Sequence, residues 1–85
     1  MISSKSYPCP CCGFLTLIEP AGSGTFDICP VCFWEDDPFQ LQRPESNGGA
    51  NKVSLNEAKK NFFEFGAKEK RVIPYVRKPT PEEIP

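Results

Sequence analysis

The sequence has 85 residues, a formal net charge of −1 and no histidine. This length predicts one domain with a core so small that disulfides or a metal must staple it. Five cysteines cannot all pair within the chain. No apolar run approaches the roughly 20 residues of a membrane helix, and the start, MISSKSYPCP, lacks the apolar core of a secretory signal. We therefore expect a soluble cytoplasmic protein, where clustered cysteines are more often metal ligands than disulfides.

The cysteines fall into two C-x-x-C pairs. Cys9 and Cys12 lie in the run YPCPCCG, Cys29 and Cys32 lie in CPVC, and sixteen residues separate the pairs. This spacing is typical of a structural zinc site, because each short gap forms a knuckle that directs two sulfurs at one tetrahedral ion. The sequence predicts Zn²⁺ bound by these four cysteines. Iron is the alternative metal, since four cysteines in two knuckles also hold a single iron, as in rubredoxin.

Two positions in the knuckles leave alternatives open. Cys11 lies outside both pairs, and is either a small residue of no special role or a ligand-swapping or redox-sensing thiol. Gly13 follows the first pair and permits a positive φ, whereas Phe33 follows the second pair, where a positive φ would be costly. We expect either a second knuckle of different shape or a Phe33 ring that packs over the sulfurs.

The spacer between the pairs predicts a β-hairpin. Residues 14–18 are apolar and β-prone, residues 19–24 form a turn cluster, and residues 25–28 alternate in polarity. A hairpin that brings two knuckles together is the zinc-ribbon arrangement. Residues 40–53 have the composition of a loop.

The second half predicts one amphipathic helix and little else. Ser54 and Glu57 form a capping box, Gly66 supplies the stop, and the residues between carry one apolar stripe formed by Leu55, Ala58, Phe62 and Phe65. Residues 71–76 predict an edge strand because of Pro74, and the proline-rich residues 79–85 predict a disordered tail. The predicted fold is therefore α+β: a zinc-ribbon-like hairpin with two cysteine knuckles, then one helix and a short edge strand, in a single domain over residues 1–78.

Three stretches also resemble a known family. YPCPCCGFLTL, ICPVCFWEDDP and GGANKVSLNEAKKNFFEFG are similar to the small bacterial cysteine-rich CPCC family, over residues 7–77. The resemblance implies a compact domain that binds metal through a cluster of Cys9, Cys11, Cys12, Cys29 and Cys32. It does not say which four bind, and it implies no established activity.

A binding function fits these features better than catalysis. A zinc ion with four thiolates has no open position, and the absence of histidine removes the commonest general base. We expect a metal-stapled protein-interaction module that is not an enzyme. The predicted partner surface combines aromatic and acidic residues after the second knuckle, namely Trp34, Glu35, Asp36, Asp37 and Phe39, and would suit another protein, possibly a basic one. The competing interpretation places Trp34 in the core and the acids on a solvated loop.

Charge separates the two halves of the chain. Residues 1–50 carry two basic and six acidic residues, a net −4, and residues 51–85 carry eight basic and five acidic residues, a net +3. Nucleic-acid binding requires a basic face, which the acidic ribbon lacks. The alternatives are therefore a nucleic-acid binder that uses the basic helix region, with Lys59, Lys60, Lys68, Lys70 and Arg71, or a rubredoxin-like iron electron carrier. The partner's identity and the oligomeric state do not follow from the sequence.

Overall fold

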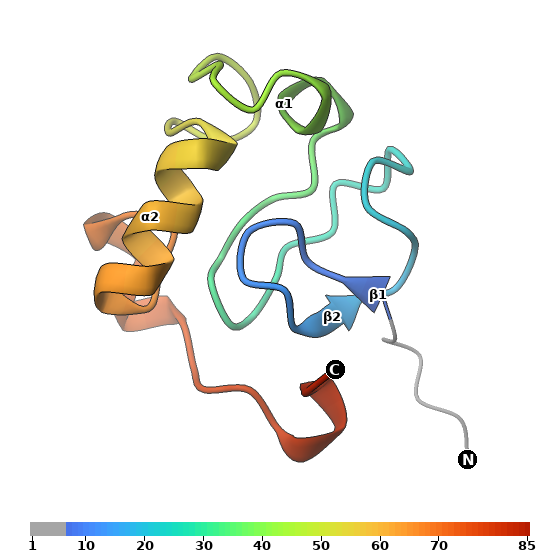
Figure 1. Cartoon of the computed structure of the whole chain (residues 1–85), viewed down its shortest axis with the longest axis vertical. Helices are drawn as coiled ribbons and strands as arrows, with labels where there is room; N and C mark the ends of the chain where they lie inside the picture. The colour runs from blue at the N-terminus through green and yellow to red at the C-terminus, as the bar shows by residue number, and fades with distance from the viewer. Residues whose placement is uncertain (1–6) are drawn as a thin grey trace.

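The computed structural model describes residues 7–85, and residues 1–6 of the predicted domain lie outside this range. The elements in order are β1 (Tyr7–Pro8), β2 (Leu15–Leu17), α1 (Pro38–Gln42), α2 (Leu55–Phe65) and two 3₁₀ helices, η1 (Lys70–Tyr75) and η2 (Pro81–Glu83). Figure 1 shows α2 on one side of the molecule, the two strands on the other and α1 above them. The small mixed fold and the cysteine-rich loops agree with the predicted class, but the strands pair differently.

The sheet consists of β1 and β2, which are antiparallel, with Tyr7 opposite Leu17 and Pro8 opposite Leu15. The predicted hairpin between residues 14–18 and 25–28 is therefore wrong, because β2 pairs across the first knuckle and not across the spacer. Residues 25–28 are held by other contacts. The Asp27 carboxylate accepts a hydrogen bond from Ile18 N at 3.0 Å, and Phe26 has a φ of 54°, which interrupts an extended conformation.

Helix α1 overlaps the first three residues of the segment, residues 40–53, that the sequence predicted to be a loop. Asp37 caps it by accepting a hydrogen bond from Phe39 N at 2.8 Å, and Pro38 occupies the first turn. Its one buried residue is Gln40. A polar side chain on the buried face gives no amphipathic pattern, so only the Asp37–Pro38 start signal marks this short helix in the sequence.

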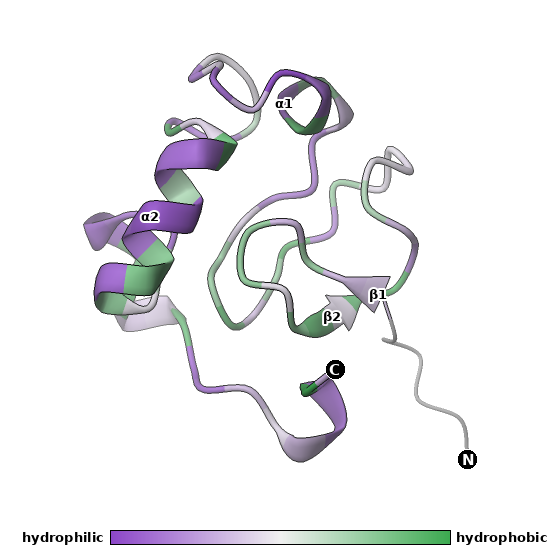
Figure 2. Cartoon of the chain, in the orientation of Figure 1, coloured by the Kyte–Doolittle hydropathy of each residue, from purple (hydrophilic) through white to green (hydrophobic). Residues whose placement is uncertain are grey.

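Helix α2 begins and ends where the sequence predicted. The Ser54 hydroxyl accepts a hydrogen bond from Glu57 N at 3.1 Å, and Gly66 ends the helix in the left-handed conformation. Figure 2 shows hydrophobic and hydrophilic residues alternating around this helix. Phe62 meets Phe14 edge to face, with 6.2 Å between ring centroids, and this contact packs the helix against the first knuckle.

The chain after α2 differs from the prediction in two places. Most of residues 71–76, which were expected to form an edge strand, instead lie in the 3₁₀ helix η1, which contains Pro74 and buries Val72. Its flanks bond the second knuckle, with Lys68 N donating to Cys32 O at 2.9 Å and Arg77 N donating to Pro30 O at 3.2 Å. These two hydrogen bonds attach the segment to the second knuckle without the series of backbone hydrogen bonds that an edge strand would make.

The predicted disordered tail is also ordered. It forms η2, which lies against β2 (Figure 1). Arg77 makes two hydrogen bonds of 2.9 Å to the Glu83 carboxylate, and Thr80 N donates to the same carboxylate at 2.9 Å. Charge-assisted bidentate pairing of this kind fixes a segment that its proline content alone predicted to be mobile.

The core surrounds the cysteines. Its buried apolar members come from both knuckles, β2 and α2 and comprise Cys9, Cys11, Leu17, Cys29, Val31, Cys32, Trp34, Leu55 and Ala58. None of the helices in residues 7–85 combines the length and hydrophobicity that crossing a membrane requires.

Candidate metal centre

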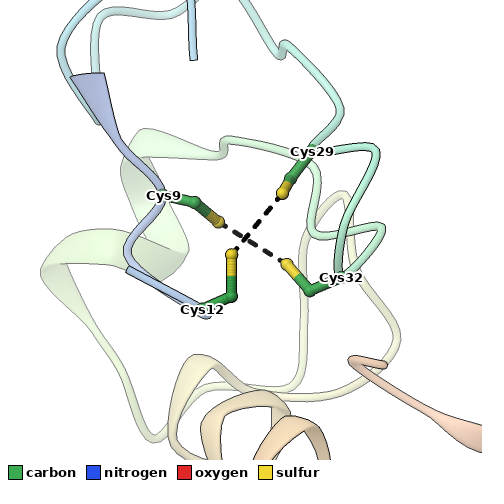
Figure 3. Close-up of side chains that lie close together, drawn as sticks. All are labelled: Cys9, Cys12, Cys29 and Cys32. Carbon is green, nitrogen blue, oxygen red and sulfur yellow. Dashed lines mark hydrogen bonds between the residues drawn. The ribbon is translucent and has the colours of Figure 1, made fainter. Parts of the chain in front are cut away.

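The first knuckle is a tight loop between β1 and β2. Cys9 N donates to Phe14 O at 2.9 Å, and Gly13 N donates to Cys9 O at 2.8 Å. Gly13 has a φ of 82°, a left-handed conformation that costs glycine little. The turn directs the side chains of Cys9 and Cys12 to the same side of the loop (Figure 3).

The second knuckle repeats this geometry. Cys29 N donates to Trp34 O at 2.9 Å, and Phe33 N donates to Cys29 O at 2.8 Å. Ile28 and Glu35 form an isolated antiparallel bridge that closes the loop. Phe33 has a φ of 72°. The expectation of a differently shaped second knuckle is therefore wrong, since Phe33 accepts the strained conformation.

Contacts around Phe33 stabilise that conformation. Its ring lies 5.8 Å from the Tyr75 ring, centroid to centroid, and the Lys68 ammonium lies 5.7 Å from its centroid. Aromatic pairs and cation–π contacts of this kind each contribute about 0.5–1.5 kcal/mol. They join η1 and the segment between α2 and η1 to the second knuckle.

The four predicted ligands meet at one point. The sulfurs of Cys9, Cys12, Cys29 and Cys32 all lie within 4.8 Å of one another. Figure 3 shows the four side chains converging from the two knuckles, with each dashed line crossing between knuckles. The Sγ–Sγ distance is 3.6 Å both for Cys9 with Cys32 and for Cys12 with Cys29.

These distances fit a metal and not disulfides. A disulfide requires about 2.05 Å between sulfurs, and all five cysteines are free. A regular tetrahedron with Zn–S bonds of about 2.3 Å has S–S edges of about 3.8 Å, close to the observed 3.6 Å. The four cysteines are therefore positioned to coordinate a metal ion.

The surroundings of the sulfurs favour thiolates held around a cation. The Thr16 hydroxyl donates to Cys29 Sγ at 3.0 Å, and backbone N–H groups of Val31 and Trp34 donate to the sulfurs of Cys29 and Cys32 at 3.4 and 3.5 Å. Hydrogen bonds from the neighbouring Cys12 thiol, then from the other thiols and Thr16, lower the pKa of Cys29. One thiolate is thus stabilised by the site itself.

The pKa values of the other three thiols shift in the opposite direction. Contacts with neighbouring thiols, together with burial, raise the pKa values of Cys9, Cys12 and Cys32. The largest single contributions come from Cys12 for Cys9, from Cys29 for Cys12 and from Cys11 for Cys32. Crowded thiols resist carrying several negative charges together, and a bound cation reverses this balance because it deprotonates its thiol ligands.

Cys11 lies beside the quartet and not in it. Its side chain is buried, with 8% of the residue exposed, and its thiol raises the pKa of Cys32. The four converging sulfurs are those that the spacing predicted, with Cys11 at the free position of the first knuckle.

The comparisons with known proteins agree with this geometry. The family described as Cysteine-rich CPCC matches residues 7–83. The chain belongs to the cysteine-rich CPCC family. The resemblance carried by the three sequence stretches is thus confirmed, and the four-cysteine cluster lies within the matched part of this CPCC chain. A search of curated proteins finds no match to it.

The predicted partner surface is not a surface in this structure. Trp34 is 0% exposed, Asp36 is 1% exposed and Asp37 is 6% exposed, while Glu35 is half-buried and Phe39 is 50% exposed. The expectation that these five residues form one exposed interface is therefore wrong. Trp34 belongs to the core, as the competing interpretation had it.

The two buried acids stabilise loops. Both oxygens of Asp36 lie 3.0 Å from Gly22 N, and burial raises the pKa of Asp36, with Gly22 opposing the shift. Asp37 caps α1 and also accepts a hydrogen bond from Ala50 N at 2.8 Å. A Cβ at Gly49 would lie 2.5 Å from the Asp37 carboxylate, so only glycine lets that loop come this close. Charge reversal at both acids would consequently disturb folding.

A buried network of polar side chains, which the sequence did not predict, is centred on Asn51. The Asn51 side chain accepts hydrogen bonds from Glu35 N at 2.9 Å and from Lys68 Nζ at 2.8 Å. Its amide donates to Glu35 O and Gln40 Oε1, each at 2.8 Å. Gln40 donates in turn to the carbonyls of Ser46, Asn51 and Val53. This network connects the segment after the second knuckle to α1 and to the segment after α2, and no periodic pattern in the sequence marks it.

Proposed function

We propose that this CPCC chain is a zinc-binding, metal-stapled protein-interaction module without catalytic activity. The observation that carries the proposal is the convergence of four cysteine sulfurs within 4.8 Å. Four thiolates fill the positions that zinc usually has in a structural site, so no position is left for substrate or water. The sequence has no histidine to act as general base or acid.

The placement of the cysteines supports a structural role for the metal. Three of the four ligands are at most 1% exposed, and the backbone of the second knuckle anchors the chain on both sides of η1. A metal here would hold β1, β2 and the C-terminal half together. Zinc gives apparent binding energies of about 10–16 kcal/mol in such sites at neutral pH, which is comparable to the whole net stability of a typical domain, about 5–15 kcal/mol.

A rigid scaffold with exposed apolar groups supports an interaction role. Outside the core, Phe63 is 91% exposed, Tyr75 is 67% exposed and Phe39 is 50% exposed. Aromatic residues are enriched at protein–protein interfaces relative to the rest of the surface. The burial of Asp36 and Asp37 removes the basis for a basic partner.

The metal is tested by elemental analysis of purified variants. We expect one zinc per chain in the wild type and in Cys11→Ser, and loss of the metal from Cys12→Ser. These two substitutions are matched, because the cysteines are neighbours in the same knuckle. Retention of zinc by Cys12→Ser together with its loss from Cys11→Ser would refute the ligand assignment. A red, iron-loaded protein would favour the electron carrier.

The interaction role is tested on a reconstituted complex. A protein captured from lysate of cells that express the chain would be purified and titrated into the zinc-loaded protein in a calorimeter. We expect saturable binding that Cys29→Ser abolishes, since the scaffold depends on the metal. Tighter, salt-dependent binding to RNA or DNA than to any protein would favour the nucleic-acid alternative.

A further inference from the structure

A hollow separates α2 from the chain that follows η1. Its volume is about 270 Å³, and its apolar lining comprises Val31, Phe62, Phe65, Val76 and Pro79. Sites for whole small-molecule ligands usually have about 300–1,000 Å³. The hollow is therefore of a size for one anchoring side chain and not for a nucleotide or a cofactor.

The second cysteine knuckle forms one wall of this hollow. Val31 lies between the ligands Cys29 and Cys32 and is 1% exposed. The opposite wall is tied to the same knuckle, because Arg77 N donates to Pro30 O at 3.2 Å. A pocket formed in advance lowers the entropy loss on binding.

Phe63 extends the apolar surface beyond the hollow. It is 91% exposed, next in sequence to Phe62 and three residues before Gly66, both of which line the hollow. Positions three apart on a helix are neighbours on its surface. The helix that lines the hollow thus also carries an exposed aromatic ring, which at 91% exposure contributes little to the core.

The charges around the hollow are mostly positive. Arg77 and Lys78 line it, and the Lys70 ammonium lies 5.9 Å from the centroid of the Phe65 ring. Glu83 pairs with Arg77, whereas Lys70 and Lys78 have no carboxylate partner within residues 7–85. Two exposed cations beside the hollow therefore remain available to an anionic partner.

We propose that this hollow, the α2–tail pocket, binds an acidic protein segment that inserts one apolar side chain. Val31, Phe62 and Phe65 receive the side chain, while Lys70 and Lys78 pair with carboxylates on either side of it. Fully desolvated anchors supply most of the affinity of such contacts, and surrounding charges select the partner and speed association. This inference rests on the proposed interaction function and gives it a place and a partner chemistry.

A protein segment fits these observations better than RNA does. Single-stranded nucleic acid binds along a continuous basic groove with flat stacking platforms. Here two of the nearby arginines are already paired, Arg71 with Glu69 and Arg77 with Glu83. What remains is an apolar recess with two separate cations, which matches one anchor flanked by acids.

The test uses random peptides displayed on phage and selected on the zinc-loaded full chain. We expect the enriched peptides to share one large apolar residue with acidic residues on both sides. Affinities of synthetic versions would be measured by fluorescence anisotropy. The double variant Lys70→Glu with Lys78→Glu should weaken binding by about tenfold or more, which corresponds to about 1.4 kcal/mol. Both lysines are exposed, so zinc content and circular dichroism should match the wild type.

A matched control and a second variant make the result decisive. Lys52→Glu reverses an exposed lysine that does not line the pocket, and it should leave the affinity nearly unchanged. Val76→Glu places a carboxylate in the pocket lining and should also abolish binding. If neither pocket variant changes the peptide affinity, or if the enriched peptides lack acidic residues, the proposed pocket is wrong, but the proposed interaction function is not affected. Failure to enrich any peptide would count against both, and tighter binding of oligouridylate than of the selected peptides would replace the protein partner by RNA.

Discussion

Phe33 has the same left-handed backbone conformation in the second knuckle that Gly13 has in the first, with φ angles of 72° and 82°. Each residue donates its N–H to the carbonyl of the first cysteine in its knuckle, at 2.8 Å. The conformation costs a residue with a Cβ about 1–2 kcal/mol. The second knuckle accepts this strain because the Phe33 ring also packs against Tyr75.

Replacing Phe33 separates the strain from the ring contacts. Phe33→Ala and Phe33→Gly both lose the contacts with Tyr75 and Lys68, but only glycine also relieves the strain. We therefore expect Phe33→Ala to have a free energy of unfolding about 1 kcal/mol lower than Phe33→Gly. Urea denaturation of the zinc-loaded proteins measures the difference.

Gly13→Ala is the control for this comparison. A Cβ at Gly13 would meet no atom within 4 Å, so the substitution adds strain without a clash and should cost about 1 kcal/mol. Equal stability of Phe33→Ala and Phe33→Gly would mean that the second knuckle relaxes to another shape when the ring is removed.

Features encoded by local spacing were predictable from the sequence. The grouping of Cys9, Cys12, Cys29 and Cys32 follows from two short gaps, and the bounds of α2 follow from Ser54 and Gly66. Both depend on residues only a few positions apart. Metal coordination and helix capping each require particular residue types at fixed spacings, so both can be recognised in the sequence.

Features that depend on distant contacts were not predictable. The predicted hairpin is wrong because β2 pairs with β1, while Ile28 bridges to Glu35 on the far side of the second knuckle. The acids Asp36 and Asp37 were expected at the surface, yet they bind backbone N–H groups of Gly22 and Ala50. An acidic residue that accepts hydrogen bonds from the N–H groups of a loop cannot be distinguished, by its neighbours in the sequence, from an acidic residue exposed to solvent. Only the folded chain distinguishes the two.

Removal of the metal should unfold the region around the knuckles. The buried sulfurs anchor both knuckles, and structural zinc contributes about 10 kcal/mol or more, against about 5–15 kcal/mol for the stability of a whole domain. We expect the amide signals of residues 7–34 to lose their dispersion in ¹H–¹⁵N spectra when a strong chelator extracts the metal. Added zinc should restore them, which controls for irreversible damage. A spectrum that stays dispersed after metal loss would show that the core folds without it.

The Arg77–Glu83 pair predicts a pH dependence of the C-terminal segment. Hydrogen bonds from Arg77 lower the pKa of Glu83 from 4.5 to about 2. A lowered folded-state pKa means that the pair's stabilisation is complete above pH 4.5 and is lost as the pH falls toward 2. NMR titration of the Glu83 carboxyl carbon should therefore show no transition near pH 4.5. In Arg77→Gln the midpoint should move upward, and a wild-type midpoint near 4.5 would contradict the pairing in solution.

Asn51 offers a test of the buried network. Asn51→Ala leaves Glu35 N and the Lys68 ammonium without their acceptor inside the protein. Each unsatisfied buried group costs about 1–3 kcal/mol, and more when it is charged. Burial also lowers the pKa of Lys68, which shows how poorly this position accommodates an unpaired charge. We expect Asn51→Ala to lower the free energy of unfolding by about 3 kcal/mol or more, whereas Asn47→Ala, at an exposed asparagine, should change it little.

A double-mutant cycle identifies the cause of that loss. Lys68→Met removes the ammonium but keeps a chain of similar length at a position that is 4% exposed. If the unpaired charge dominates the effect of Asn51→Ala, the double variant should be more stable than the sum of the single effects predicts, by about 1 kcal/mol or more. Additive losses measured by urea denaturation would instead assign the effect to Glu35 N and Gln40, and would show that Lys68 reaches water when its acceptor is removed.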